Sequence, residues 1–184
     1  MKATNVLSEE HRVIERVLNT LEAGAQRLAS EQPMPPEFFI SATDFIKGFA
    51  DGCHHRKEEG VLFIRMEAQG VPVQGGPIGV MLAEHELGRQ YTRALRSAAL
   101  DMQSGDENAA RRVVENAQNY VALLRQHIYK EDHMLFPMAD RVIPADQYDS
   151  VWEGFEHVEH EETGEGVHEK YLALAESLER QLVD

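Results

Sequence analysis

Apolar residues recur at spacings of three and four along most of the chain, and this spacing predicts amphipathic helices. The first helix is expected to end near Ser30, ahead of Pro33, with Thr4 or Asn5 as its N-cap. Its apolar face would consist of Leu7, Ile14, Leu18 and Leu21. The second helix should begin near Glu37 and run toward a glycine-rich loop at 70–76.

Two further long helices follow that loop. Pro77 suits the first turn of a third helix, which should end near residues 104–105. The fourth is expected to begin at Asp106, as its cap, and to be interrupted by Pro137 and Pro144. A short helical segment over about 145–162 and a last amphipathic helix beyond Gly166 complete the pattern.

No strand-like alternation bounded by turn residues occurs in the sequence. Four long helices joined mostly by short loops predict an all-α, antiparallel up-and-down four-helix bundle over about residues 4–140. A C-terminal helical extension over about 145–184 would belong to the same single domain, 1–184. We expect Phe49, Phe63, Met81, Met134 and Trp152 to pack in the core.

The net charge of the chain argues against two classes of binding partner, nucleic acids and membranes. The 184 residues include 32 acidic and 18 basic ones, a formal net charge of -14, so phosphate backbones and anionic lipid surfaces would be repelled. We therefore expect no nucleic-acid partner and no membrane partner, and no apolar run approaches the roughly 18 residues of a membrane helix. The single cysteine, Cys53, and an N-terminus without a secretory signal favour a cytoplasmic location, while the oligomeric state stays open.

A weak internal repeat carries the candidate chemistry. Residues 54–63 on the second predicted helix and 127–136 on the fourth share the pattern His-x-x-Lys-Glu-acid-x-x-Leu-Phe. A histidine and a glutamate four residues apart lie on one helix face, so His54 with Glu58, and His127 with Glu131, point in the same direction. Apolar residues in the same register indicate that this direction is the core.

The other two long helices add one histidine each. His11 lies in line with the apolar residues of the first helix, and His85 with those of the third. Burying four imidazoles and two carboxylates without a partner would be very unfavourable, and metal ions resolve this problem. Two first-row cations, each bound by two imidazoles and bridged by the two glutamates, fit this donor set. Iron or manganese suits it, and the ligand types also admit zinc.

Other histidines and acids near the repeat receive a simpler interpretation. His55 is about 100° around an α-helix from His54, so we expect it at the bundle edge, on the surface or behind the ligands. Glu15 and Glu59 should orient ligands or face solvent. His133 should not bind metal, because Pro137 occupies its partner position. The stretch 155–162 is interpreted as a solvated acidic helix, and the roles of His157, His160 and His168 stay open.

These ordered motifs resemble the hemerythrin-like, or HHE cation-binding, domain family over roughly residues 4–140. The resemblance implies a non-haem di-iron centre, in which an oxo or hydroxo group can bridge the ions, with zinc or manganese as less favoured metals. Family roles are reversible oxygen binding, iron sensing, response to nitric oxide and peroxide chemistry. The ligands that it implies are His11, His54, Glu58, His85, His127 and Glu131.

The sequence departs from the oxygen-carrying hemerythrins on the third helix. Those proteins place two histidines four residues apart there, whereas the residues at that spacing from His85 are Met81 and Arg89. One ligand is therefore missing or supplied from elsewhere, which puts oxygen carriage in doubt. Some family members use the acid five residues after the histidine, here Asp132, but Glu131 matches Glu58 in the repeat and is preferred.

Three functions follow from these expectations. The first is a di-iron protein that binds or reacts with a small diatomic or peroxide ligand, meaning O2, peroxide or nitric oxide. The second is an iron-binding sensor or regulator without turnover, and the third, ranked last, is a metal-free helical structural protein. Whether the protein is an enzyme, and which residues would then be catalytic, stays open.

Overall fold

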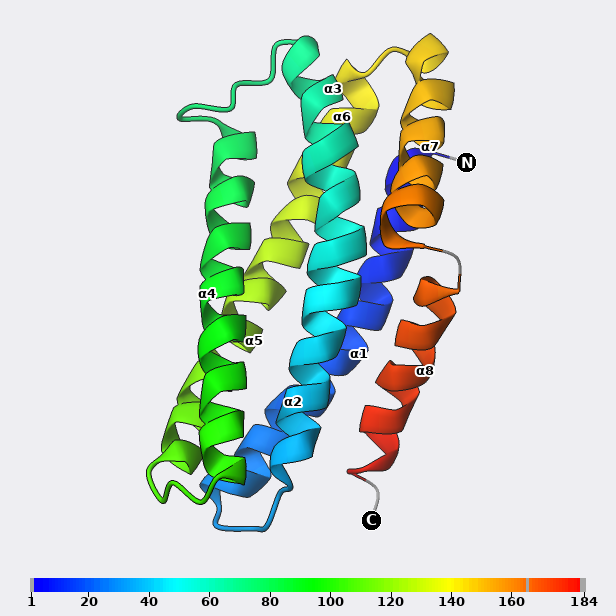
Figure 1. Ribbon diagram of the computed structural model, residues 1–184. Helices are drawn as coiled ribbons and strands as arrows, with labels where there is room; N and C mark the ends of the chain where they lie inside the picture. Colours follow the sequence, from blue (N-terminus) through cyan, green and yellow to red (C-terminus); the bar gives the residue numbers. More distant parts are fainter. Residues whose placement is uncertain (1, 165, 183–184) are drawn as a thin grey trace.

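The computed structural model describes residues 2–164 and 166–182, and these contain helices and turns but no strand. The four long helical segments alternate in direction, as predicted (Figure 1). They are α1 (Ala3–Ala29); α2 (Pro36–Phe45) continued by η1 (Ile46–His55), η2 (Glu58–Leu62) and α3 (Phe63–Ala68); α4 (Pro77–Gln103); and α5 (Ala109–Lys130) continued by η3 (Glu131–Leu135) and α6 (Phe136–Val142). The C-terminal part comprises η4 (Ala145–Gln147), α7 (Tyr148–His157), η5 (Val158–Thr163) and α8 (Val167–Arg180).

Helix boundaries follow the prolines more closely than the expected caps. Pro36 and Pro77 lie in the first turn of α2 and α4, where their missing N–H groups cost nothing. The predicted caps, Thr4 or Asn5 for the first helix and Asp106 for the fourth, are wrong, because α1 begins at Ala3 and α5 at Ala109, both without a side-chain cap. The Thr4 hydroxyl instead donates to Asp140 Oδ1, at 2.9 Å.

Stretches of π-helix occur within the second and fourth long helices. The segments η1, η2 and η3 close i→i+5 hydrogen bonds, and two of them begin at Glu58 and Glu131 of the repeat. Pro137 does not interrupt the fourth helix, contrary to expectation, because η3 precedes it and the helix continues as α6 to Val142. The helix ends just before Pro144.

The candidate metal residues form a polar layer between two apolar cores. One core includes Leu18, Phe45 and Leu95, and the other includes Leu7, Phe63 and Leu135. On every long helix a stretch of each core flanks the histidines, and the order of the two cores reverses from one helix to the next. This reversal is what an up-and-down bundle requires, and it brings all the histidines to one level.

The C-terminal helices cover one side of this bundle. Figure 1 shows α8 beside α1 and α2, and α7 beside the upper half of the bundle. Ala175 and Leu178 of α8 are fully buried, and Arg16 binds Glu179 through two hydrogen bonds of 2.8 and 2.7 Å. Tyr171 lies so close to Gly48 that any Cβ on that glycine would overlap the tyrosine ring.

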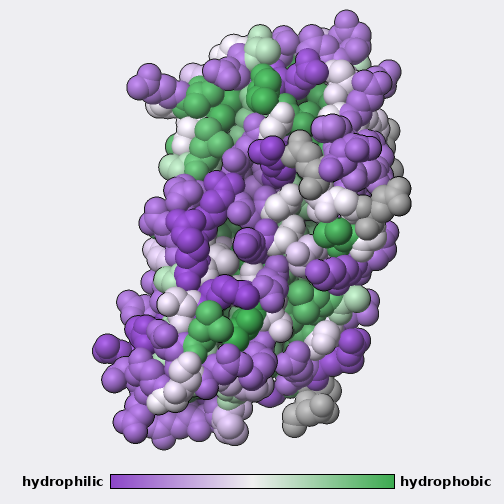
Figure 2. Space-filling view, in the orientation of Figure 1, coloured by the Kyte–Doolittle hydropathy of each residue, from purple (hydrophilic) through white to green (hydrophobic). Residues whose placement is uncertain are grey.

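The surface is largely hydrophilic on the face of Figure 2, where hydrophobic residues gather over the upper end of α4. Val80 and Leu87 of that helix are 48% and 36% exposed. Met134 is 61% exposed, so its prediction as a core residue was wrong; η3 shifts the phase of the helix at this point. Among the described residues, no helix is long and apolar enough to cross a lipid bilayer.

Candidate metal centre

The structure brings the six predicted residues together in the polar layer. His11, His54, Glu58, His85, His127 and Glu131 are each 2% exposed or less. Glu131 lies between helices, with its carboxylate oxygens 3.2 Å from His11 Nε2 and 3.1 Å from His127 Nε2. Glu58 lies opposite, 3.6 Å from His54 Nε2 and 3.4 Å from His85 Nε2. Each glutamate therefore contacts histidines of two different helices.

His55 also belongs to this layer, and the prediction that places it at the bundle edge was wrong. It is 5% exposed, and its ring stacks on that of His85 with a centroid separation of 3.8 Å. The π-helical turns of η1 and η2 place more residues in each turn than an α-helix does, so the 100° step does not apply. Both His54 and His55 consequently face the core.

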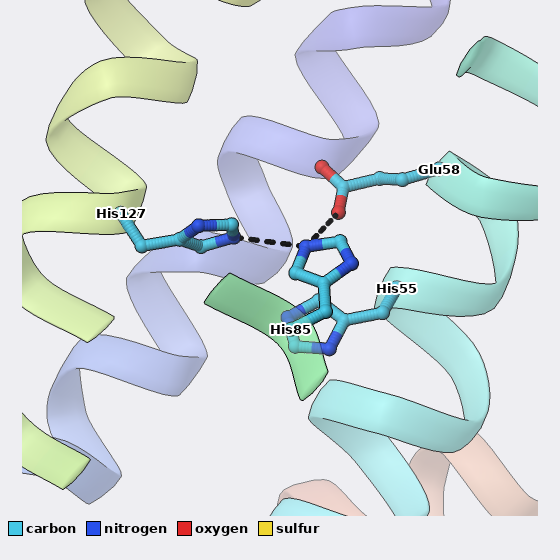
Figure 3. A group of neighbouring side chains, drawn as sticks. All are labelled: His55, Glu58, His85 and His127. Carbon is cyan, nitrogen blue, oxygen red and sulfur yellow. Dashed lines mark hydrogen bonds and ion pairs between the residues drawn. The ribbon is translucent and has the colours of Figure 1, made fainter. Parts of the chain in front are cut away.

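Two groups of donor atoms lie side by side. His55, Glu58, His85 and His127 form the first group (Figure 3), and His11, His54, Glu58 and Glu131 form the second. Within each group, one donor atom per residue lies within 4.8 Å of the others, and all the members are buried. Glu58 belongs to both groups, which is the arrangement expected of a carboxylate shared by two cations.

The Nδ1 atom of each predicted histidine is held by a carboxylate outside the layer. The Nδ1 atoms of His11, His54, His85 and His127 lie 2.8, 2.9, 2.7 and 2.9 Å from carboxylate oxygens. The four partners are, in the same order, Asp132, Glu10, Glu59 and Glu84. When Nδ1–H donates to these acids, the lone pair of each Nε2 is directed toward the middle of the layer.

The lysines of the repeat complete this arrangement. Lys57 Nζ donates to Glu10 Oε1 at 2.6 Å, while the other oxygen of Glu10 accepts from His54. Lys130 Nζ donates in the same way to Glu84, whose other oxygen accepts from His127. In each copy of the motif, the lysine binds an acid from a neighbouring helix, and that acid in turn holds the histidine of the same motif. This contact explains the shared lysine in physical terms.

The electrostatics of the layer favour cations. Burial, and then the charge of Glu131, raise the pKa of Glu58 well above its usual range. Burial would also raise the pKa of Glu131, but His127 and His11 lower it. Two buried carboxylates so close together are ionised at the same time only when enough positive charge lies between them. Metal binding would therefore release a proton from Glu58.

The histidines differ in protonation. Burial and the nearby His11 ring lower the pKa of His54 to about 4, and burial and His85 lower that of His55 to about 3. These two rings are neutral near pH 7, which is the form that binds metal. Burial would lower the pKa of His127, but Glu131 and Glu84 raise it to about 9, so a cation has to displace a proton there.

The donor set fits metal ions. The described residues leave buried donor atoms without a hydrogen-bond partner in the layer: His11 Nε2, His54 Nε2 and both carboxylate oxygens of Glu58 and of Glu131. Such atoms are costly in a protein interior unless a ligand satisfies them. Imidazole nitrogens and carboxylate oxygens together suit iron, manganese or zinc.

The remaining sequence candidates lie outside the layer. Asp132 and Glu59 bind the Nδ1 atoms of His11 and His85 rather than facing the middle. Glu15 pairs with Arg12 at the surface, and His133 is exposed, with its ring near the carbonyl oxygen of Tyr129. His160 is exposed and lies 3.2 Å from Glu156, as expected of a solvated helix.

A third group of possible donors lies near the C-terminal helices. Glu10, Cys53, Glu159 and His168 have donor atoms within 4.8 Å of one another. Lys57 Nζ already binds two of its members, at 2.6 Å from Glu10 and 2.7 Å from Glu159. The lysine ammonium therefore supplies the positive charge that this group needs.

Sequence reasoning missed one member of the layer, His55, and two of the acids that hold its histidines, Glu10 and Glu84. Glu10 and Glu84 carry no spacing signal, because they act on histidines of other helices. His55 adjoins His54, and the π-helical turns that bring it inward leave no mark in the hydrophobic pattern. The glycines at 48, 52 and 60 lie in these turns and are the one local hint of irregular helix.

Comparisons with known proteins agree with this geometry. The chain is 24% identical over 176 residues to uncharacterised proteins of Mycobacterium tuberculosis and Mycobacterium bovis, covering 96% of this chain and 68% of theirs. It is 28% identical over 137 residues to the iron-sulfur cluster repair protein YtfE of Dickeya chrysanthemi, covering 72% of this chain and 61% of that protein. No solved structure matches.

A family model gives the broader assignment. The hemerythrin HHE cation binding domain matches residues 2–139, which include every histidine and glutamate of the polar layer. Together with the all-helical fold and the two groups of histidines and glutamates, this match establishes the relationship that the motifs indicated. The chain belongs to the hemerythrin HHE cation-binding domain family.

Proposed function

We propose that this chain is a non-haem di-iron protein that binds or reacts with a small oxidant, meaning O2, peroxide or nitric oxide. The observation that carries the proposal is the pair of adjacent donor groups that share Glu58. One cation would be held by His55, His85 and His127, the other by His11 and His54. Glu58 and Glu131 would serve both, since each contacts histidines of two helices.

His55 changes the expected ligand count. It supplies the additional histidine that the third helix lacks at positions 81 and 89, and it lies against His85 in the layer. The proposed set therefore contains five histidines and two glutamates. With His55 in this role, the metal centre no longer lacks the second histidine of the third helix. Oxygen binding therefore stays among the candidate reactions.

Iron is the metal that best matches the observations. Mixed imidazole and carboxylate ligation suits it, and the Dickeya relative is named for the repair of iron-sulfur clusters. Bound iron would supply the one-electron chemistry by which O2, peroxide or nitric oxide is bound or reduced. Manganese and zinc remain the competing metals, and elemental analysis distinguishes them.

The chain itself contributes orientation and a water-poor environment. Asp132, Glu10, Glu59 and Glu84 fix the four predicted imidazoles by accepting from Nδ1. The ring of Phe136 stacks on His11 at 5.3 Å, and that of Phe63 on His85 at 6.0 Å. These aromatic walls limit access of water to the layer from the side of the second apolar core.

Metal quantification on protein expressed with iron tests the proposal. Two irons per chain are expected, and His54→Ala or His127→Ala should lose metal, whereas the exposed His160→Ala should keep it. Adding O2, peroxide and nitric oxide in turn should change the visible absorption spectrum of the iron form. Retention of full iron content in both core variants, or an unchanged spectrum with all three molecules, would contradict the proposal.

An iron sensor without turnover is the second candidate. This candidate is favoured because the donor atoms come from four separate helical segments, which have to converge to hold the cations. Loss of metal would then loosen the bundle and alter the surface covered by α7 and α8. A sensor would show faster proteolysis near α8 on chelation and no consumption of peroxide or nitric oxide, whereas a reactive centre would consume one of them.

A further inference from the structure

A lateral cavity connects the surface with the polar layer. Its volume is about 240 Å³, and it lies between the α2–η1 segment, α4 and α5. Its lining includes the exposed Lys47 and Arg93 and, deeper in the fold, the stacked rings of His55 and His85 (Figure 3). The cavity therefore runs from solvent to two of the proposed metal ligands. A cavity of about 150 Å³ is enough for a benzene molecule, so this one exceeds the needs of O2, nitric oxide or hydrogen peroxide.

The charges around the cavity are balanced. Each arginine in its described lining is ion-paired with at least one acid. The pairs are Arg89 with Asp51 and Glu59, Arg93 with Glu86, and Arg96 with Asp44. Because the guanidinium groups face these acids, their aliphatic stems line the cavity, and most of the surface that it presents is apolar.

This balance selects against charged ligands. An anion that entered the cavity would lose hydration without gaining an unpaired arginine, which is unfavourable. The charge of Lys47 does not change this balance, because that side chain is exposed and water screens it. The cavity therefore suits a neutral molecule with an apolar body.

The inner wall of the cavity offers an unused hydrogen-bond donor. Tyr120 is 1% exposed, and its hydroxyl has no partner among the described residues. Burial, and the charge of Asp51, raise the pKa of this phenol, so the hydroxyl stays protonated and able to donate. A buried hydroxyl of this kind normally finds an acceptor. A neutral ligand with an oxygen at its inner end would supply one.

Gly88 keeps the cavity open. A Cβ built on it would lie 3.5 Å or more from its nearest neighbours, Leu124 and Tyr120, which is ordinary contact. Packing therefore does not require glycine here, although glycine in a helix interior costs stability relative to alanine. The missing side chain leaves space beside Tyr120, on the same helix as His85 and about one turn beyond it.

From these features we infer that the cavity binds a neutral organic hydroperoxide, R–O–O–H with a small apolar body, and presents its oxygens to the metal layer. The apolar body would lie against Ile46 and the open side of Gly88, and a peroxide oxygen would accept from Tyr120. Hydrogen peroxide would leave most of the cavity empty, whereas an organic hydroperoxide fills it. The inference rests on the proposed function and names the substrate class of the same site.

The reaction that this placement supports is a two-electron reduction. The O–O bond breaks on receipt of two electrons, one from each ferrous ion of the proposed centre. With two protons from solvent, the products are one alcohol R–O–H, one water molecule and two ferric ions. Tyr120 contributes the hydrogen bond that orients the peroxide, and the paired arginines and Gly88 determine which peroxides enter.

Calorimetric titration of the full, chelated chain with cumyl alcohol tests the cavity without iron. This neutral alcohol is the reduction product of cumene hydroperoxide and keeps its apolar body and inner oxygen. Binding with a Kd of about 1 mM or tighter is expected. Tyr120→Phe should weaken it about fivefold through loss of one hydrogen bond. Phenylacetate, an anionic control of similar size, should bind more weakly than the alcohol.

A size series at Gly88 locates the site. Gly88→Leu should fill the cavity and weaken binding of cumyl alcohol more than about tenfold. Gly88→Ala adds a single carbon and should weaken it much less. Absence of binding by the parent chain up to about 5 mM, unchanged binding by Gly88→Leu or by Tyr120→Phe, or tighter binding of phenylacetate would each overturn the inference.

The reaction itself is measured on the ferrous protein, mixed without oxygen with one equivalent of cumene hydroperoxide or of hydrogen peroxide. One cumyl alcohol per pair of irons is expected by chromatography, with oxidation of both ions. Gly88→Leu should slow the reaction with cumene hydroperoxide more than about tenfold relative to that with hydrogen peroxide, because only the larger substrate needs the full cavity.

The two peroxides separate this inference from the proposed function. Reaction of the parent chain with hydrogen peroxide but not with cumene hydroperoxide would overturn the inference and leave the proposed function intact. Equal slowing of both reactions by Gly88→Leu would also overturn it, because the substitution would then act on the metal centre. Failure of the iron form with O2, both peroxides and nitric oxide would contradict the proposed function and the inference together.

Discussion

At the scale of single residues, Lys57 and Lys130 occupy the same position in the two motifs but lie in different surroundings. The Lys57 side chain is fully buried and binds Glu10 and Glu159. Lys130 is 32% exposed and binds Glu84. Burial makes the loss of one partner from an ion pair costly, because the remaining charge is left without water. Exposed pairs contribute little, since solvent replaces the partner.

This contrast predicts unequal costs for the same substitution. Lys57→Met should lower the free energy of unfolding by about 3–5 kcal/mol, because it leaves the buried Glu10 without its cation. Lys130→Met should lower it by less than about 1 kcal/mol. Urea denaturation of the two chelated variants measures both values. Equal losses would show that the packing around the lysines, and not burial of the charge, sets their contribution.

Cys53 provides a pH-dependent prediction. Burial raises the pKa of its thiol to about 11, so near pH 7 the native protein holds the unreactive thiol form. We expect slow reaction with a disulfide reagent at pH 8, faster reaction as the pH approaches 11, and complete reaction at pH 8 in denaturant. Absorbance of the released thiolate follows the rate. Rapid labelling of the native chain at pH 8 would contradict this description of the site.

At this scale, the sequence predicts the histidines and glutamates that face the core better than it predicts the acids that bind the histidine Nδ1 atoms. His54 and Glu58 share a face by local geometry, so spacing alone places them together. Glu10 and Glu84 act across helices, and no local pattern connects them with His54 and His127. Pairings of this kind depend on how helices pack, which a single sequence leaves open.

At the scale of helices, close approach depends on particular glycines. A Cβ on Gly24 of α1 would lie 2.3 Å from the ring of Phe38, where the start of α2 packs against α1. A Cβ on Gly88 of α4 would make only ordinary contacts. The same substitution therefore has opposite consequences in two helices of the same bundle.

Gly24→Ala and Gly88→Ala form a matched pair. Gly24→Ala should destabilise the protein by about 1–3 kcal/mol, because Phe38 or the helix axis has to move. Gly88→Ala should stabilise it by up to about 1 kcal/mol through the higher helix propensity of alanine. Chemical denaturation curves of both variants test the pair. A destabilised Gly88→Ala would mean that α4 packs more tightly at this point than the structure shows.

Hydrophobic periodicity predicts the helices themselves, but not where a helix changes from α-helical to π-helical turns. The long helices begin and end near the expected residues, since prolines and apolar spacing are local signals. The π-helical turns are different, because the apolar spacing does not mark where they occur. His55 and Met134, whose predicted environments were wrong, each lie inside such a π-helical segment.

At the scale of the whole molecule, the polar layer links metal binding to stability. Within the described part of the chain, the layer leaves several buried donor atoms without a hydrogen-bond partner, and bound cations would satisfy them. The predicted bundle, including its C-terminal extension, follows from length and apolar spacing, and it is confirmed. How that extension packs beside α1 and α2 depends on individual contacts, such as Tyr171 with Gly48, that periodicity does not encode.

Chelation should therefore lower the melting temperature. A ligand present at about a thousand times its Kd adds about 4 kcal/mol, which corresponds to roughly 10 °C for a chain of this size. Differential scanning calorimetry with and without iron measures the shift. His54→Ala, as the control, should melt at the same temperature with and without iron. An unchanged melting temperature of the parent chain would contradict the expectation that metal binding stabilises the fold.

The π-helical turns also bear on transplanting this centre into other scaffolds. A designer who copied the His-His-x-x-Glu segment onto a regular helix would obtain one inward imidazole, and the second would project sideways into a neighbouring groove. A successful graft therefore has to reproduce the wider π-helical turns, with about one more residue in each turn, as well as the side chains.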